Sequence, residues 1–82
     1  MNTGHLVQMA NQIAEYHAVF PKHEEAVDGV ANHIRRFWEP RMRSAIYEHL
    51  DGHKGAGLHP LVIEALTLRA ELIRPQVKPA QA

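Results

Sequence analysis

The chain has 82 residues, with nine basic and nine acidic side chains and no cysteine. So short a chain forms one domain of marginal stability, and its zero formal charge provides no general attraction for nucleic acid or anionic lipid. The missing cysteines exclude disulfides, thiolate metal sites and cysteine nucleophiles. Together with the lack of a signal-peptide pattern or an apolar run of roughly 18 residues, they favour a cytoplasmic protein that does not enter the membrane.

Apolar residues recur with the period of a helix throughout the chain, and no alternating strand pattern competes with it. We therefore expect an all-α fold, a small bundle of three to four short helices with an extended C-terminal tail. Residues 1–73 are predicted to form the helical domain. Residues 74–82, which contain two prolines and mainly polar residues, are predicted to form a flexible tail.

The first two predicted helices are amphipathic. The first follows a possible cap at Thr3 and ends before Pro21, and the second runs from about Glu24 to Trp38. The first apolar stripe contains Leu6, Met9, Ala10, Ile13, Tyr16, His17 and Phe20, and the second contains Ala26, Val27, Val30, Ala31, Ile34, Phe37 and Trp38.

The third predicted helix begins at Pro40 and ends at Asp51-Gly52, since proline suits the first helical turn and glycine often ends a helix. The fourth begins at Pro60 and runs to about Ile73. It is apolar around most of its circumference, with one stripe of Leu61, Ala65, Leu68 and Leu72 and a second of Val62, Ile63, Leu66, Ala70 and Ile73. We expect this surplus apolar surface to form an interface, because three short neighbours would not cover it.

The histidines do not form a recognisable catalytic or metal-binding pattern. His49 and His53 are four residues apart, but the predicted helix end at Gly52 would separate them, and no carboxylate follows with the spacing of a zinc protease. His17 and His49 lie on apolar stripes, where a neutral imidazole with one satisfied hydrogen bond is the ordinary role. Ser44, the one serine, lacks the glycine-framed turn of a nucleophile, so no catalytic residue is predicted.

The densest chemical feature is residues 33–43, which contain four arginines, the single tryptophan and the break at Glu39-Pro40. Arginine and tryptophan are enriched at binding hot spots, so one interpretation is docking of a partner protein. The alternative is that Phe37, Trp38 and Met42 belong to the core. A DNA-binding helix-turn-helix is disfavoured, because the break is too tight and the net charge is zero.

Three stretches carry a resemblance to a known family: residues 9–13 (MANQI), residues 29–43 (GVANHIRRFWEPRMR) and residues 57–61 (GLHPL). With them, the chain from about Leu6 to Leu72 resembles the delta subunit of NAD-dependent formate dehydrogenase. The block from Phe37 to Arg43 is its most specific part.

The resemblance implies an accessory subunit of a cytoplasmic complex that oxidises formate to carbon dioxide and reduces NAD. In that family a pterin-bound molybdenum or tungsten, iron–sulfur clusters and FMN belong to the larger subunits. This chain is then expected to bind no cofactor or metal, and to bind the catalytic alpha subunit in a complex with beta and gamma subunits. Two alternatives remain, a transient chaperone for cofactor insertion into the alpha subunit and a free homodimer.

No residue role is transferred from the family, so the candidate partner-binding residues come from the sequence chemistry. They belong to the arginine–tryptophan block and to the second stripe of the last helix: Arg35, Arg36, Trp38, Pro40, Arg41, Met42, Arg43, Val62, Ile63, Leu66 and Ile73.

Overall fold

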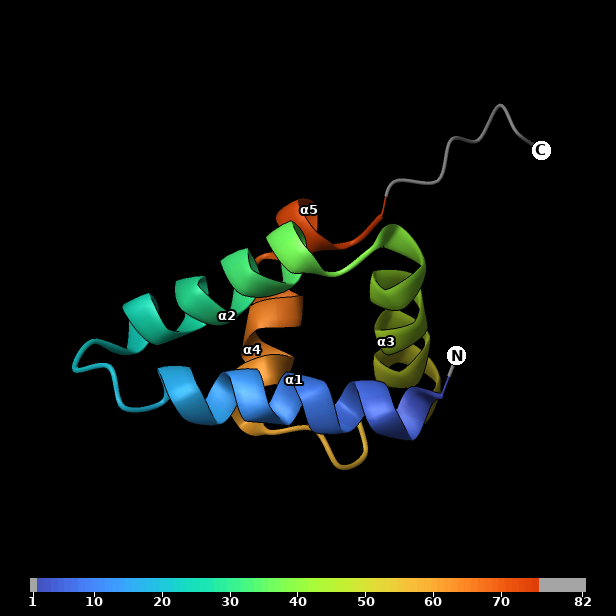
Figure 1. Ribbon diagram of the computed structural model, residues 1–82, viewed down its shortest axis with the longest axis horizontal. Helices are drawn as coiled ribbons and strands as arrows, with labels where there is room; N and C mark the ends of the chain where they lie inside the picture. The colour runs from blue at the N-terminus through green and yellow to red at the C-terminus, as the bar shows by residue number, and fades with distance from the viewer. Residues whose placement is uncertain (1, 76–82) are drawn as a thin grey trace.

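The computed structural model describes residues 2–75, which form five helices and contain no strand (Figure 1). They are α1 (Thr3–His17), α2 (His23–Phe37), α3 (Pro40–His53), α4 (Pro60–Leu68) and α5 (Ala70–Ile73). The prediction of an all-α bundle is confirmed. Residues 76–82, most of the predicted tail, lie outside the described residues. No helix in the described part has the length and apolar character that crossing a bilayer requires.

The helices surround α4, which packs against α1, α2 and α5, while α3 stands against α1 at the other end of the molecule (Figure 1). All five helices contribute to a single core, whose largest fully buried side chains are Val30, Ile34, Ile46, Val62, Leu66 and Ile73. Tyr47 also lies in this core, where its hydroxyl donates a hydrogen bond of 2.7 Å to the carbonyl oxygen of Leu66.

The helix starts follow local chemistry. Pro40 and Pro60 occupy the first turns of α3 and α4, as predicted. His59 caps α4 by accepting a hydrogen bond from the Leu61 N–H at 3.0 Å. The predicted cap at Thr3 is wrong. Asn2 caps α1 instead, since its side-chain oxygen accepts from the His5 N–H at 3.2 Å.

The predicted end of the third helix at Asp51-Gly52 is also wrong, because α3 continues to His53. The left-handed residues that stop it come later, at Lys54 with φ 56° and Gly55 with φ 67°. Gly52 is therefore an ordinary helical residue, and His49 and His53 share one helix.

The expectation of an uncovered apolar face is wrong for the second stripe of the last helix, whereas Leu68 and Leu72 of the first stripe are 54% and 41% exposed. Val62, Leu66 and Ile73 have no exposed surface, and Ile63 packs partly buried against the core. The segment also splits at Arg69, whose backbone leaves helical geometry (φ −119°, ψ 32°). This break turns α5 toward α2, so that α4 is covered from several sides by this chain itself.

At the end of α2, neighbouring aromatic residues have opposite environments. Trp38 is 4% exposed, so the core interpretation is correct for it, whereas Phe37 is 67% exposed and the same interpretation is wrong. The backbone becomes extended at Trp38 (φ −91°, ψ 132°), which turns the indole inward after the last helical residue. Tyr16 was also expected on the apolar stripe of the first helix, yet it is 69% exposed.

Candidate functional site

A row of five rings, here called the aromatic cluster, runs across the neighbouring surfaces of α1 and α2. It contains Tyr16, His17, Phe20, His33 and Phe37. Ring centroids lie 5.0 Å apart between Tyr16 and His17, 6.5 Å between His17 and His33, and 4.8 Å between His33 and Phe37. The two rings at the ends of this row are those that remain about two-thirds exposed.

Beside these rings lies a hollow of about 490 Å³, here called the aromatic groove. It is lined by Met9, Gln12, Ile13, Tyr16, His17, His33 and Trp38. Trp38 is buried, while Met9 and Ile13 are partly buried, so the lining is largely apolar and held by core contacts. Such a hollow, bordered by exposed rings, can accept an apolar side chain of another protein.

The two histidines of the groove differ in what surrounds their rings. The His17 Nδ1–H donates a hydrogen bond of 2.9 Å to the carbonyl oxygen of Ile13. Partial burial, and to a smaller extent the proximity of His17, lower the pKa of His33 from its ordinary value of 6.5. His33 is thus uncharged at pH 7, which suits an apolar ligand.

The arginines of residues 33–43 do not form one surface. Arg36 lies over the Phe37 ring, with its guanidinium carbon 5.8 Å from the ring centroid, and so borders the aromatic cluster. Arg41 is exposed on α3. Arg35 points about 100° away from Arg36 around α2, and it lines a different hollow together with Arg43 of α3.

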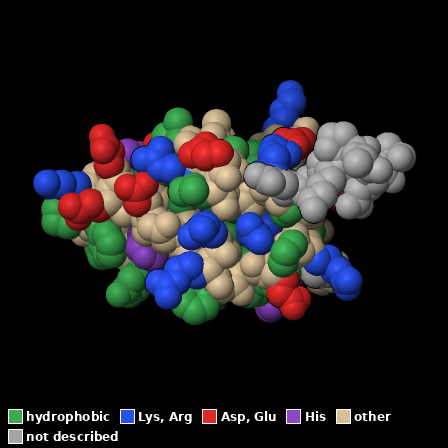
Figure 2. Space-filling model, turned by 90° about the horizontal axis from the view of Figure 1, so that it is seen from above, with side chains coloured by type: hydrophobic (Ala, Val, Ile, Leu, Met, Phe, Trp, Pro, Cys, Tyr) green, Lys and Arg blue, Asp and Glu red, His purple; other side chains and the backbone are tan. Residues whose placement is uncertain are grey.

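That second hollow, here called the arginine pocket, has a volume of about 350 Å³ and is lined by Arg35, Pro40, Arg43, Glu71, Leu72, Arg74 and Pro75. Figure 2 looks onto the side of the molecule that carries α2, α5 and the start of α3. Basic side chains gather across the middle of this face, whereas acidic ones lie mainly toward the end where α2 begins.

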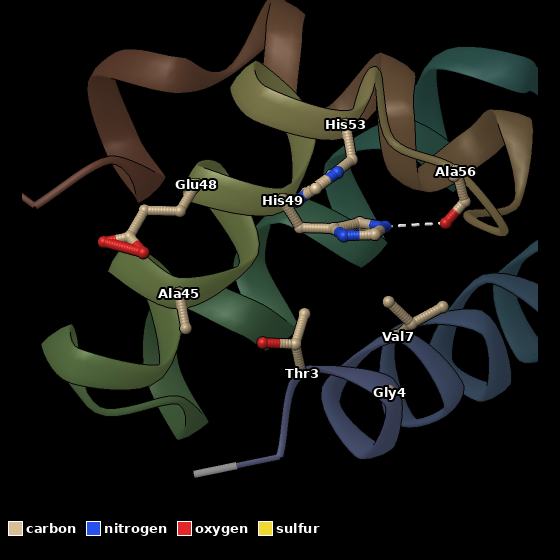
Figure 3. Close-up of a pocket in the computed structure, with 8 residues that line it drawn as sticks. All are labelled: Thr3, Gly4, Val7, Ala45, Glu48, His49, His53 and Ala56. Carbon is tan, nitrogen blue, oxygen red and sulfur yellow. Dashed lines mark hydrogen bonds between the residues drawn. The ribbon is translucent and has the colours of Figure 1, made fainter.

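A third hollow, of about 620 Å³, lies between the start of α1 and the end of α3 (Figure 3). The rings of His49 and His53 are 5.5 Å apart, and the His49 Nε2–H donates to the carbonyl oxygen of Ala56 at 2.6 Å. The Glu48 carboxylate points away from both rings (Figure 3). Among residues 2–75, no three histidine or acidic side chains are grouped so that they could hold a metal ion.

The structure therefore divides the predicted partner-binding residues. Trp38, Val62, Leu66 and Ile73 are buried in the chain's own core, while Arg35, Arg36, Pro40 and Arg41 are exposed, and Met42, Arg43 and Ile63 are intermediate.

Sequence reasoning missed the contribution of α1, which supplies most of the aromatic groove. A usable signal was present in Ala10 and Ala14. These two small residues are the fully buried ones, whereas the larger apolar residues beside them, Met9 and Ile13, are only partly buried.

Comparison with known proteins gives one match. The model of the family described as "NADH-dependant formate dehydrogenase delta subunit FdsD" matches residues 5–66, which is more than half of the chain. The comparisons with curated proteins and with solved structures found no match.

Proposed function

The chain belongs to the family of NADH-dependent formate dehydrogenase delta subunits, and from this membership we propose that it is a non-catalytic accessory subunit. It binds the catalytic alpha subunit of a cytoplasmic NAD-dependent formate dehydrogenase and supports the assembly or stability of the complex. The pterin-bound molybdenum or tungsten, the iron–sulfur clusters and FMN are held by the larger subunits. This chain has no cysteine with which to ligate a cluster.

The observation that carries the proposal is the exposure of two large aromatic rings beside an apolar hollow. Tyr16 and Phe37 are 69% and 67% exposed, at opposite ends of the aromatic cluster. Exposed apolar surface grouped in this way is typical of a protein interface. We propose that the aromatic groove, with Tyr16, Phe37 and Arg36 at its border, docks on the alpha subunit. Of the buried candidate residues, Trp38 lines this groove.

The size of the effect follows from the area. A phenylalanine presents about 200 Å² in an extended chain, and two-thirds of that area at about 25 cal/mol per Å² gives about 3 kcal/mol if docking buries the whole exposed part of Phe37. Arg36 over the Phe37 ring adds a guanidinium that can donate to a partner carboxylate at the rim. Truncation of one such ring is enough to weaken a complex measurably.

The test is co-purification of the delta chain with the large subunits after Phe37→Ala. We expect at least a tenfold weaker association, because about 1.4 kcal/mol corresponds to a factor of ten. The matched control is Leu68→Ala, which truncates another apolar side chain, 54% exposed on α4, that belongs neither to the aromatic cluster nor to the groove lining. Circular dichroism of each variant checks that the helices are retained.

Equal recovery of the complex with wild-type chain and with Phe37→Ala would contradict the assignment of this surface. Two further measurements separate the alternatives. If purified active enzyme contains no delta chain, the transient chaperone is favoured over the permanent subunit. If light scattering shows that the chain alone is a dimer, and Phe37→Ala makes it a monomer, the same surface serves self-association instead.

A further inference from the structure

The arginine pocket has no part in the proposed docking, and its chemistry differs from that of the aromatic groove. Three arginines from distant parts of the chain line it: Arg35 from α2, Arg43 from α3, and Arg74 from the residue after α5. Glu71 is the one carboxylate in its lining. With Asp51, which forms an ion pair with Arg74, the lining and its ion-pair partner carry one more positive charge than negative.

Two of the three guanidinium groups are held in place by contacts with their own chain. Arg43 Nη1 donates to the carbonyl oxygen of Ile73 at 2.9 Å. Arg74 donates to both carboxylate oxygens of Asp51, at 3.2 and 3.4 Å, and its guanidinium carbon lies 4.1 Å from the centroid of the Tyr47 ring. These contacts fix the positions of two positive charges before any ligand arrives, so less side-chain entropy is lost on binding.

The pocket also has donors that the described residues leave unused. Within residues 2–75, neither Arg35 nor Arg43 forms an ion pair, and the buried Nε of Arg43 has no hydrogen-bond partner. A buried polar nitrogen without a partner is costly, but this one is covered by the protein, so a bound oxyanion reaches it only after a shift of the Arg43 side chain. Arg35 is exposed and can turn its planar set of donors toward a ligand between the three side chains.

We propose that the arginine pocket is an oxyanion-binding site, which takes one carboxylate or phosphate group. Guanidinium groups match the two oxygens of a carboxylate or phosphate through paired N–H donors, which is why arginine predominates where such groups are recognised. A volume of about 350 Å³ holds a single oxyanion and the group that carries it. Glu71 at the wall lowers affinity for groups with greater negative charge, so binding is selective but modest.

The test is titration of the full, isotope-labelled chain with sodium phosphate and with sodium formate, followed by nuclear magnetic resonance of the backbone and arginine Nε–H signals. Sodium chloride at the same ionic strength is the reference. We expect saturable shifts that centre on Arg35, Arg43 and Leu72 with at least one of the two oxyanions and are absent with chloride. Shifts that never saturate, or that chloride reproduces, would overturn the proposal.

The decisive variant is Arg35→Gln, since Arg35 is exposed and its removal leaves the contact between Arg43 and Ile73 intact. We expect the dissociation constant to rise about tenfold or more, as for the loss of a charged hydrogen bond. Arg41→Gln makes the same charge change at an exposed residue of α3 that does not line the pocket, and should bind as the wild type does. If both variants weaken oxyanion binding equally, the binding depends only on the total charge of the chain, and the proposal of a defined site is refuted.

The same variants distinguish two sources of the oxyanion. If Arg35→Gln lowers recovery of the assembled complex and free phosphate lowers wild-type recovery similarly, the oxyanion is a side chain of the partner. If recovery is unchanged and the assembled complex still binds phosphate, the oxyanion is a free ion. Because the titration uses the isolated chain and a pocket whose lining does not include Phe37, its failure leaves the proposed docking surface untouched.

Discussion

Gly29→Ala tests a close contact between α1 and α2, where Gly29 faces the ring of His17. A methyl group at position 29 would lie 2.2 Å from Cδ2 and 2.8 Å from Nε2 of the His17 ring. The ring cannot move away freely, because His17 Nδ1 is bonded to the Ile13 carbonyl oxygen at 2.9 Å. Tyr16 and Phe20 also pack edge-on against it, with centroid distances of 5.0 and 5.1 Å. The substitution must therefore displace the imidazole or separate the two helices.

The expected magnitude is the difference between two opposing effects. Alanine in place of glycine within a helix normally stabilises by about 1 kcal/mol. Overpacking costs about 1–3 kcal/mol, and loss of the His17 hydrogen bond costs about 1 kcal/mol more. We expect Gly29→Ala to lower the free energy of unfolding by about 1–3 kcal/mol. Gly52→Ala is the matched control. It is also helical, its added methyl meets nothing within 4 Å, and it should stabilise by about 0.5–1 kcal/mol.

Urea unfolding followed by far-ultraviolet circular dichroism measures both variants, and thermal unfolding checks them at about 4–8 °C per kcal/mol for a domain of this size. Opposite shifts of the midpoint are expected. The close packing of His17 on Gly29 would be refuted if Gly29→Ala stabilised the chain as much as Gly52→Ala does. Introducing Gly29→Ala into a His17→Ala background supplies the internal check, since the methyl then has room and the helix preference of alanine should dominate.

The other predictions concern Tyr47, which is buried, and His33, which is partly buried. Tyr47→Phe should lower the free energy of unfolding by about 1–3 kcal/mol in urea at pH 7, because the Leu66 carbonyl oxygen loses its donor. Burial raises the pKa of Tyr47 from its ordinary 10.0 to about 12, and the positive charge of Arg74 opposes this shift to a smaller extent. Unfolded chains then lose this proton first, so stability should fall from pH 10 toward 12, and a Tyr47→Phe variant with the same fall would contradict the assignment. Burial and His17 instead lower the pKa of His33 below 6.5, so unfolded chains gain this proton first. Stability should therefore fall as the pH drops below 6.5, and an unchanged fall in His33→Gln would show that other groups cause it.

The sequence predicted the interior of the second helix well but not its end. Ala26, Val27, Val30, Ala31 and Ile34 are all buried on the arc that a helical period predicts. Phe37 and Trp38 extend the same arc on a helical wheel, yet only Trp38 is buried. The wheel assumes helical geometry throughout, and it stops being valid at Trp38, where the backbone becomes extended. Boundary residues therefore carried the largest error, and they include the residue on which the docking proposal depends.

The fourth predicted helix shows a different limit. Its apolar circumference correctly indicated burial on several sides, but periodicity cannot tell whether this chain or a partner supplies the covering surface. The break at Arg69 allows this chain to cover its own apolar residues, because it turns α5 so that Ile73 joins Val62 and Leu66 in the core. No proline or glycine marks that break. Arg69 donates to Asp28 of α2 at 2.7 Å, an ion pair between residues far apart in the sequence that local patterns do not reveal.

Arg35 and Arg36 show how one sequence motif can serve two purposes. In the sequence they belong to a single basic block, which suggested one docking surface. In the structure Arg36 borders the exposed rings of the aromatic cluster, and Arg35 lines a polar pocket with Arg43 and Arg74. Because the linings of the groove and the pocket share no residue, each can be removed without disturbing the other. In the two proposals taken together, the chain combines apolar anchoring on a partner with recognition of an oxyanion, and the two contributions are separable by single substitutions.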